Sequence, residues 1–315
     1  MTFRELLKGR LRRVGKSLVG LDAIEEKLVE EKILTAKVLI NQMKAKGAQG
    51  TLRESEFKAF SQFGDDGIIQ YLIHHIGIPV EQQVFIEFGV ESYEEANTRF
   101  LLMNDNWRGL IMDGSAANIE HVQQGSLYWK HDLTAVAAFI TRDNVDSLFR
   151  ENGFTGEIGL LSIDIDGNDY WVWERVEAVN PIIVVVEYNS VLGSQHAVTI
   201  PYSPEFRRTQ AHYSNLYWGC SLRALYLLGE RRGYAFVGCN SAGNNAYFVR
   251  TDKLGALKTL TVEEGYVNSR FRESRDSGGR LTYLRGKDRI NEVKNMEVYD
   301  VKTDQNIRIE YLYRK

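Results

Sequence analysis

Two short apolar segments that end abruptly in acidic and amide residues constrain the fold of this chain most. They are Leu-Leu-Ser-Ile-Asp-Ile-Asp-Gly-Asn-Asp at 160–169 and Ile-Ile-Val-Val-Val-Glu-Tyr-Asn at 182–189. A continuous apolar run is typical of a strand that is buried on both faces of a parallel sheet. In open α/β sheets the ligand crevice lies beyond the carboxyl ends of such strands. We therefore expect one crevice edge to gather the polar residues Asp164, Asp166, Asn168, Asp169, Glu187 and Asn189.

The region around these segments alternates predicted helices and strands, which predicts a doubly wound α/β sheet. Helices are expected at 65–76, 97–104, 116–124, 134–152, 171–179 and 221–232, and further strands at 84–89, 110–113 and 127–129. Strands at 234–238 and 246–250 are joined by a Gly/Asn-rich connection, which indicates an antiparallel hairpin. A second hairpin is expected near the C-terminus, over 296–301 and 306–312.

Composition and charge narrow the class of protein. The 315 residues are 43% hydrophobic and 26% charged with a net charge of −3, which gives no general attraction to nucleic acid. The aliphatic runs are far shorter than the ~20 residues that cross a bilayer, and no signal peptide is visible, so a cytoplasmic protein is expected. Cys220 and Cys239 match neither a disulfide framework nor a metal-ligand spacing. We expect a helical extension over 1–50, a main domain over 51–255 and a C-terminal extension over 256–315.

The first twenty residues form a predicted basic amphipathic helix. Its basic residues are Arg4, Lys8, Arg10, Arg12, Arg13 and Lys16, against the single acid Glu5. Such a helix suits an anionic membrane surface or an acidic partner, but it could equally pack on its own protein or on a second copy in a homo-oligomer. A second helix is expected over 21–46, whose apolar spacing departs from heptads and disfavours a long coiled coil.

The loop after the first strand points to the charge of the ligand. It reads Glu87-Phe-Gly89-Val-Glu91-Ser-Tyr-Glu-Glu, with one glycine and three further glutamates. A dinucleotide-binding turn needs several glycines around the pyrophosphate, and acids would repel phosphate, which disfavours an oxidoreductase. S-adenosylmethionine carries a sulfonium and an ammonium and no phosphate. Asp113, before Gly114 at the end of the second strand, could accept hydrogen bonds from both ribose hydroxyls, or cap the next helix.

These features together resemble class I S-adenosylmethionine-dependent methyltransferases, and more closely the FkbM-like branch of sugar and glycan O-methyltransferases. The matching segments are 61–67, 87–89, 111–114, 162–170, 186–189 and 217–224, within about residues 55 to 250. Glu91 and Tyr93 stand where the family has its second and third loop glycines.

The resemblance implies a Rossmann-like methyltransferase fold, with a seven-stranded sheet that is mostly parallel and closed by an antiparallel hairpin. It implies S-adenosylmethionine as cofactor and O-methylation of a sugar hydroxyl in a glycan or sugar-nucleotide precursor. The alternative is a degenerate protein that binds the cofactor or a glycan-assembly partner without turnover. The expected cofactor-binding residues are Gln62, Glu87, Gly89, Asp113, Gly114, Asp132 and Asp164.

The clustered acids allow two interpretations. Packed carboxylates repel unless a cation joins them, and Mg²⁺ prefers carboxylate and amide oxygens, so Asp164, Glu187 and Asn189 could hold magnesium. Alternatively, Asp164 contacts the cofactor ammonium while the others cap helices or bind sugar hydroxyls. Asp164, Glu187 and His196 are the catalytic candidates, with His196 as base or as an ordinary loop histidine. Asp166 and Asp169 precede a helix and are expected to cap it.

Overall fold

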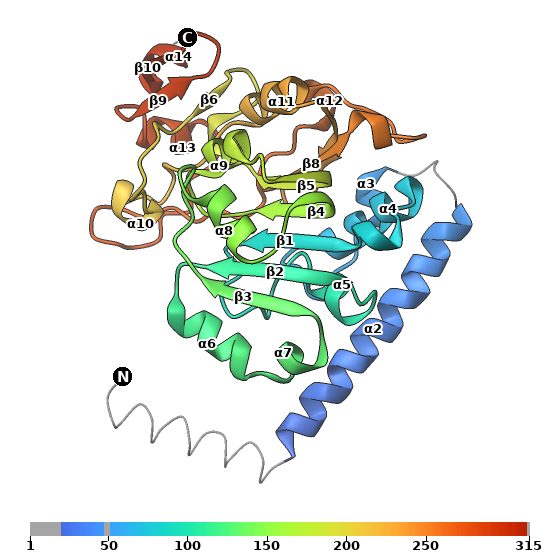
Figure 1. Ribbon diagram of the computed structural model, residues 1–315. Coiled ribbons are helices and arrows are strands. Elements are labelled where there is room, and N and C mark those ends of the chain that lie inside the picture. The colour runs from blue at the N-terminus through green and yellow to red at the C-terminus, as the bar shows by residue number, and fades with distance from the viewer. Residues whose placement is uncertain (1–19, 47–50, 314–315) are drawn as a thin grey trace.

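A seven-stranded sheet forms the centre of the computed structural model, which describes residues 20–46 and 51–313 (Figure 1). The strand order is β3-β2-β1-β4-β5-β8-β7, and β8 alone runs antiparallel to its neighbours. This is a Rossmann-like methyltransferase fold, so the predicted seven-stranded sheet with its closing hairpin is confirmed. The strands are β1 Val84–Phe88, β2 Arg108–Asp113, β3 Leu133–Ala137, β4 Gly156–Ile163, β5 Val179–Glu187, β7 Tyr234–Cys239 and β8 Asn245–Arg250.

Both faces of the sheet are covered, which explains the continuous apolar runs. Along β5, Val184 and Val186 belong to one core, whereas Ile183 and Val185 belong to the other. Because successive strand residues point to opposite faces, a strand between two cores needs an apolar residue at every position. The first core includes helices α8 Val145–Glu151, α9 Asp169–Arg175 and α11 Leu222–Arg231, and the second includes α4 Asp65–Ile76, α5 Arg99–Met103 and α6 Ala116–Gln124.

The region around β3 differs from the prediction. Residues 127–129, expected as a strand, lie within helix α7 Ser126–Lys130, and the helix expected over 134–152 is instead strand β3 followed by α8. The sequence Leu-Thr-Ala-Val-Ala of β3 is short and half-buried at the edge of the sheet. Pairing with β2 therefore decides its conformation, not a strong local pattern.

A small second sheet joins distant parts of the chain. It has the order β10-β9-β6, with β6 Val198–Thr199, β9 Glu297–Asp300 and β10 Gln305–Arg308. The predicted C-terminal hairpin is therefore confirmed as β9 and β10. Because β6 belongs to the segment between β5 and α11, the hairpin is attached to the chain that follows β5. The remaining helices are α3 Leu52–Ser55, α10 Arg208–Ala211, α12 Val262–Gly265, α13 Lys287–Glu292, α14 Ile309–Leu312 and the 3₁₀ turns η2 Val80–Gln82, η3 Ser190–Leu192 and η4 Thr251–Lys253.

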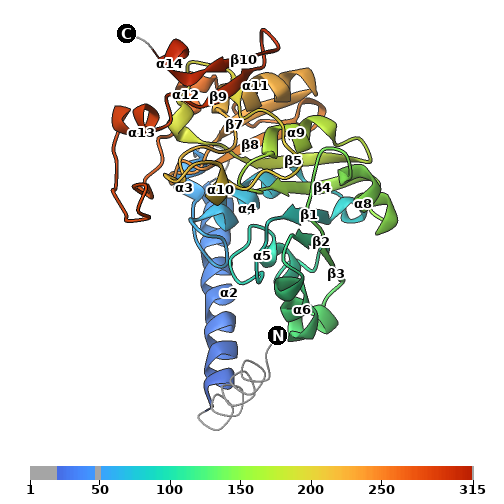
Figure 2. The same ribbon diagram turned by 90° about the vertical axis from the view of Figure 1, so that its left-hand side faces the viewer.

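A long helix, α2 Leu21–Lys46, confirms the prediction for 21–46 and lies along one side of the body (Figure 2). Its apolar residues Ala36 and Ile40 are buried against Phe60 and Phe100. The basic helix predicted for 1–20 falls, up to residue 19, outside the described residues. Among residues 20–46 and 51–313, no helix combines the length and the hydropathy needed to cross a bilayer.

Candidate active site

A cavity of about 610 Å³ lies at the carboxyl edge of the sheet, where the fold predicts a ligand. The ends of β1, β2, β3, β4 and β5 and the start of β8 line it, together with the segment before α10. Its lining is strongly acidic: seven carboxylate side chains face two arginines. The acids are Glu87, Glu91, Glu95, Asp113, Asp164, Asp166 and Glu187, and the arginines are Arg207 and Arg208. Such a lining favours a cationic ligand over a phosphate.

The loop after β1 keeps a glycine-like backbone although it contains Glu91 and Tyr93 in place of glycines. Gly89 has a φ of +69°, and a Cβ there would lie 1.7 Å from the carbonyl oxygen of Asp164. Glu91 and Tyr93 also have positive φ, at 46° and 60°. Left-handed backbone costs a non-glycine residue roughly 1–2 kcal/mol. Burial of Tyr93 and its 2.9 Å hydroxyl bond to Thr98 help to offset that cost.

Asp113 at the end of β2 holds this loop in place. Its Oδ2 accepts from Glu91 N at 2.9 Å, and its Oδ1 accepts from Ser115 N at 2.8 Å and Asn118 Nδ2 at 3.3 Å. The cap of α6 is Ser115, so Asp113 does not cap that helix itself. A carboxylate has about four acceptor positions. Asp113 therefore retains acceptor capacity where it lines the cavity beside Gly114.

Glu87 also lines the cavity, but its carboxylate is already engaged. It accepts from Asn97 N at 2.8 Å and from Thr98 N and Oγ1 at 3.0 and 2.5 Å, which fixes the chain at the start of α5. Burial raises the pKa of Glu87 to about 7. Its main contribution is thus to shape the part of the cavity near the end of β1; Gln62 also lines the cavity.

The turn after β4 is built by Asp169. Its two carboxylate oxygens accept from Ile165 N and Gly167 N, both at 2.9 Å, and burial raises its pKa to about 6. Asp169 therefore shapes the turn, but it does not cap the helix as predicted, because Asn168 is the N-cap of α9 and Asp169 is its first residue. Asp166 has a φ of 55° and forms a 2.6 Å ion pair with Arg208. It faces the cavity and is no helix cap, contrary to prediction.

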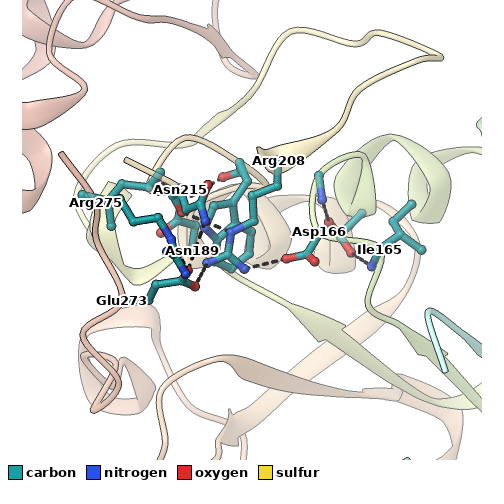
Figure 3. Close-up of polar contacts among 11 residues, drawn as sticks. Ile165, Asp166, Asn189, Arg208, Asn215, Glu273 and Arg275 are labelled. Atoms are coloured by element: carbon teal, nitrogen blue, oxygen red, sulfur yellow. Dashed lines mark hydrogen bonds and ion pairs between the residues drawn. The ribbon is translucent and has the colours of Figure 1, made fainter. Parts of the chain in front are cut away.

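Arg208 connects three segments above the cavity (Figure 3). Besides Asp166, its guanidinium donates to the carbonyl of Asn215 at 3.1 Å and lies 3.5 Å from the carboxylate of Glu273. It also stacks on Trp218, 4.7 Å from the ring centre. Arg208 thereby ties the turn after β4 to α10 and to the C-terminal part of the chain.

Asp164 and Glu187, from adjacent strands, bring their carboxyl groups within hydrogen-bonding distance in the cavity. Burial raises both pKa values well above the usual range, and each carboxylate raises the pKa of the other further. Two carboxyl groups can form a hydrogen bond when one is protonated. Without a cation in the cavity, these shifts favour a proton shared by the pair.

Three buried acceptor atoms in the cavity lining find no hydrogen-bond partner among the described residues. They are Asn168 Oδ1, Glu187 Oε2 and Asn245 Oδ1, on side chains 3%, 6% and 4% exposed. The amide of Asn245 is oriented because its Nδ2 donates to the buried Asp65 at 3.0 Å. Unpaired buried acceptors are costly. This wall of the cavity therefore suits a ligand that presents several O–H or N–H donors.

Asn189 does not contribute to the cavity. Its Nδ2 donates to the carbonyls of Leu216 and Trp218 at 3.0 and 2.9 Å, and its Oδ1 accepts from Val191 N at 3.0 Å. The predicted magnesium trio is therefore not assembled, since its amide is fully used in holding backbone. Across the described residues, no three His, Cys, Asp or Glu side chains gather at a spacing suited to a metal. The predicted trio of Asp164, Glu187 and Asn189 therefore does not fit Mg²⁺.

Two further predicted site residues lie elsewhere. Asp132 precedes β3, at the opposite edge of the sheet, where its 73% exposed side chain lies 3.9 Å from Arg108. The strand predicted at 127–129 placed Asp132 at a carboxyl end, whereas Asp132 precedes β3. The carboxyl end of β3 brings Phe139 to the cavity. His196 is not a lining residue. Its ring packs against Tyr313, 4.9 Å between centroids, because β6 carries this segment to the small sheet.

Several lining residues carry no local sequence signal for the site. Asn245 lies in the predicted hairpin connection, and Phe206 to Arg208 belong to an irregular segment without a local pattern. One signal was available: β8 is antiparallel, so its first residues had to lie at the carboxyl edge of the parallel strands.

No protein-family model and no curated protein matches this chain. Among solved structures it is similar to an O-methyltransferase from Bacillus cereus in complex with S-adenosylhomocysteine (12% identity, 68% of this chain, 88% of that chain, TM-score 0.38). It is also similar to the N-terminal domain of EvdMO1 in the presence of S-adenosylhomocysteine and D-fucose (11%, 68% and 94%, TM-score 0.39) and to the pyocyanin biosynthetic protein PhzM (14%, 58% and 56%, TM-score 0.32). Similarity at this level does not assign an activity, so the functional argument rests on the cavity.

Proposed function

We propose that this protein is an S-adenosylmethionine-dependent methyltransferase of the FkbM-like branch that methylates a hydroxyl of a sugar or glycan precursor. The observation that carries the proposal is the cavity. Asp113, an acid that could bind a ribose, lines it at the end of β2, and unpaired buried acceptors line it near the ends of β4 and β5. Asp113 would bind the ribose, and the acidic lining would accommodate the sulfonium and ammonium. When bound, the cofactor supplies an electrophilic methyl group.

The three cavity residues with unpaired acceptor atoms support a methyl acceptor that carries hydroxyl groups. Asn168, Glu187 and Asn245 each offer an unpaired oxygen, and a polyol can donate to all three. Glu187 can take the proton of the attacking hydroxyl, because a raised pKa brings a carboxylate closer to the basicity that proton transfer at neutral pH needs. Asp164 adjoins it and stabilises the protonated form by hydrogen bonding.

The proposal is tested by calorimetry and by methyl transfer. S-adenosylhomocysteine should bind at micromolar concentration and NAD should not; absence of S-adenosylhomocysteine binding would refute the proposal. Transfer of a labelled methyl group from S-adenosylmethionine to a panel of sugars, sugar nucleotides and glycans should then identify an acceptor. Tight cofactor binding without transfer to any acceptor would instead favour the alternative, a degenerate protein that binds without turnover.

A further inference from the structure

Helix α2 carries apolar side chains on the side that faces away from the body. Ile24, Leu28, Leu34 and Val38 are 52%, 54%, 61% and 55% exposed. At 3.6 residues per turn these four side chains project within an arc of about 120°. We call them the outer stripe. Single exposed apolar residues are ordinary, but a row along one helix marks an interaction surface.

The outer stripe is not needed for the attachment of α2 to its own body. The opposite side of the helix provides that contact through Val29, Ile33, Ala36, Ile40 and Met43, which pack in a cluster with residues of the main domain. Within residues 20–46 and 51–313, nothing covers the outer stripe, as its exposed fractions show.

We propose that the outer stripe is a homodimer interface, in which the α2 helices of two copies pack antiparallel about a two-fold axis at residue 31. Ile24 and Val38 are equally far from residue 31 along the helix, and so are Leu28 and Leu34. The axis therefore places Ile24 opposite Val38 of the second copy and Leu28 opposite Leu34. Such self-complementarity is what a two-fold interface requires. The inference does not depend on the proposed methyltransferase function.

The charges of α2 favour the antiparallel arrangement. Up to residue 31 the helix contains Asp22, Glu25, Glu26, Glu30 and Glu31 against Lys27, whereas after residue 31 it contains Lys32, Lys37, Lys44 and Lys46 and no acid. Antiparallel packing brings the acidic half of one helix beside the basic half of the other, and parallel packing would align like charges. The glutamates also disfavour an anionic membrane as the occupant, since a membrane-surface helix carries a basic polar face.

The two-fold axis predicts an unusual contact. Glu31 lies on the same side of α2 as the outer stripe, so the two Glu31 side chains approach each other at the axis. Replacing both with glutamine removes this repulsion. We therefore expect Glu31→Gln to lower the dimer dissociation constant roughly two- to fivefold, whereas at most exposed positions the loss of a charge changes little.

Sedimentation velocity on the full chain over a concentration series measures the dimer. The wild type should be a reversible dimer, and Leu28→Glu should raise the dissociation constant at least about 30-fold, because each dimer loses two apolar contacts. Val80→Glu is the matched control, since Val80 is 79% exposed and lies outside α2. A far-UV circular dichroism spectrum equal to that of the wild type verifies that each variant is folded. A wild type that stays monomeric throughout overturns the proposal.

Oxidative cross-linking tests the axis and the orientation. Both native cysteines are buried, so only an engineered cysteine is exposed for cross-linking. Glu31→Cys should form an intermolecular disulfide with an added oxidant, and a mixture of Ile24→Cys and Val38→Cys copies should do the same. Ile24→Cys by itself should not, because antiparallel packing separates its two copies by about 21 Å along the helix. Cross-linking of Ile24→Cys to itself, or none at residue 31, would overturn the arrangement.

Discussion

The carboxyl groups of Asp164 and Glu187 lie within hydrogen-bonding distance of each other although their residues belong to different strands. Burial and mutual repulsion raise both pKa values, which favours a proton shared by the pair. A cation that enters the cavity favours the ionised forms and lowers these pKa values.

The first prediction is that cofactor binding releases protons. S-adenosylmethionine carries one more positive charge than S-adenosylhomocysteine, so it should release more protons at pH 7. Calorimetry in two buffers of different ionisation enthalpy measures this release. The difference between the two ligands should shrink in Asp164→Asn. Equal proton release by both ligands in the wild type would contradict the shared proton.

A second prediction concerns Asp113. Asp113→Ala should weaken S-adenosylhomocysteine binding roughly 10- to 100-fold, the effect of losing hydrogen bonds to a charged acceptor. The matched control is Asp132→Ala, because Asp132 lies at the opposite edge of the sheet. Titration calorimetry of both variants decides the matter, and equal affinities in the two would remove Asp113 from the cofactor site.

The catalytic base gives a third prediction. With an acceptor identified, Glu187→Gln should lower kcat about 10²–10⁴-fold while S-adenosylhomocysteine affinity stays within a few-fold. His196→Ala should leave kcat unchanged, since the His196 ring packs on Tyr313 away from the cavity. Steady-state kinetics of the two variants compare the two base candidates directly. A large loss of kcat in His196→Ala with little change in Glu187→Gln would instead identify His196 as the base.

Removal of metal supplies a fourth prediction. Methyl transfer should survive EDTA without loss, because the Asn189 amide is committed to backbone groups and leaves the predicted magnesium trio incomplete. Activity that disappears with EDTA and returns with Mg²⁺ would show that a different set of ligands assembles in the working enzyme.

The pH dependence of stability is a fifth prediction. The pKa of Glu87 rises from its ordinary value of 4.5 to about 7 in the folded protein, so the folded state binds a proton more tightly than the unfolded state. Its contribution to stability is therefore present below about pH 4.5 and is lost as the pH rises through 7, by up to about 3 kcal/mol. Unfolding temperatures between pH 5 and 8 should show a smaller decrease in Glu87→Gln than in the wild type, after subtraction of any constant offset.

The parts of the fold that could be predicted are those that leave a local pattern. β4 and β5 were predictable because each lies between two cores and then ends in acids at the ligand edge. β3 was not, because an edge strand of Leu-Thr-Ala-Val-Ala takes its conformation from pairing with β2. Because the third strand was predicted too early in the chain, Asp132 was expected at the carboxyl edge of the sheet, but it lies at the opposite edge.

Contacts between distant segments explain the remaining misses in the site. Asn245 faces the cavity because Asp65, far away in the sequence, fixes its amide. His196 leaves the cavity because β6 pairs with β9 from the C-terminal hairpin. Neither pairing has a signature in the neighbouring residues, whereas Asp164 and Glu187 could be found from the strands that carry them.

The small sheet of β6, β9 and β10 has a consequence for synthesis on the ribosome. The part of the cavity lining that follows β1, β2, β3 and β4 is encoded before residue 170, so it can form early in translation. The segment between β5 and α11 can pair with β9 only after residues 297–300 have left the ribosome. The ion pair between Arg208 and Glu273 likewise requires that Glu273 has been synthesised. A nascent chain would therefore complete the part of the cavity formed by β1 to β4 before the part formed by the segment after β5.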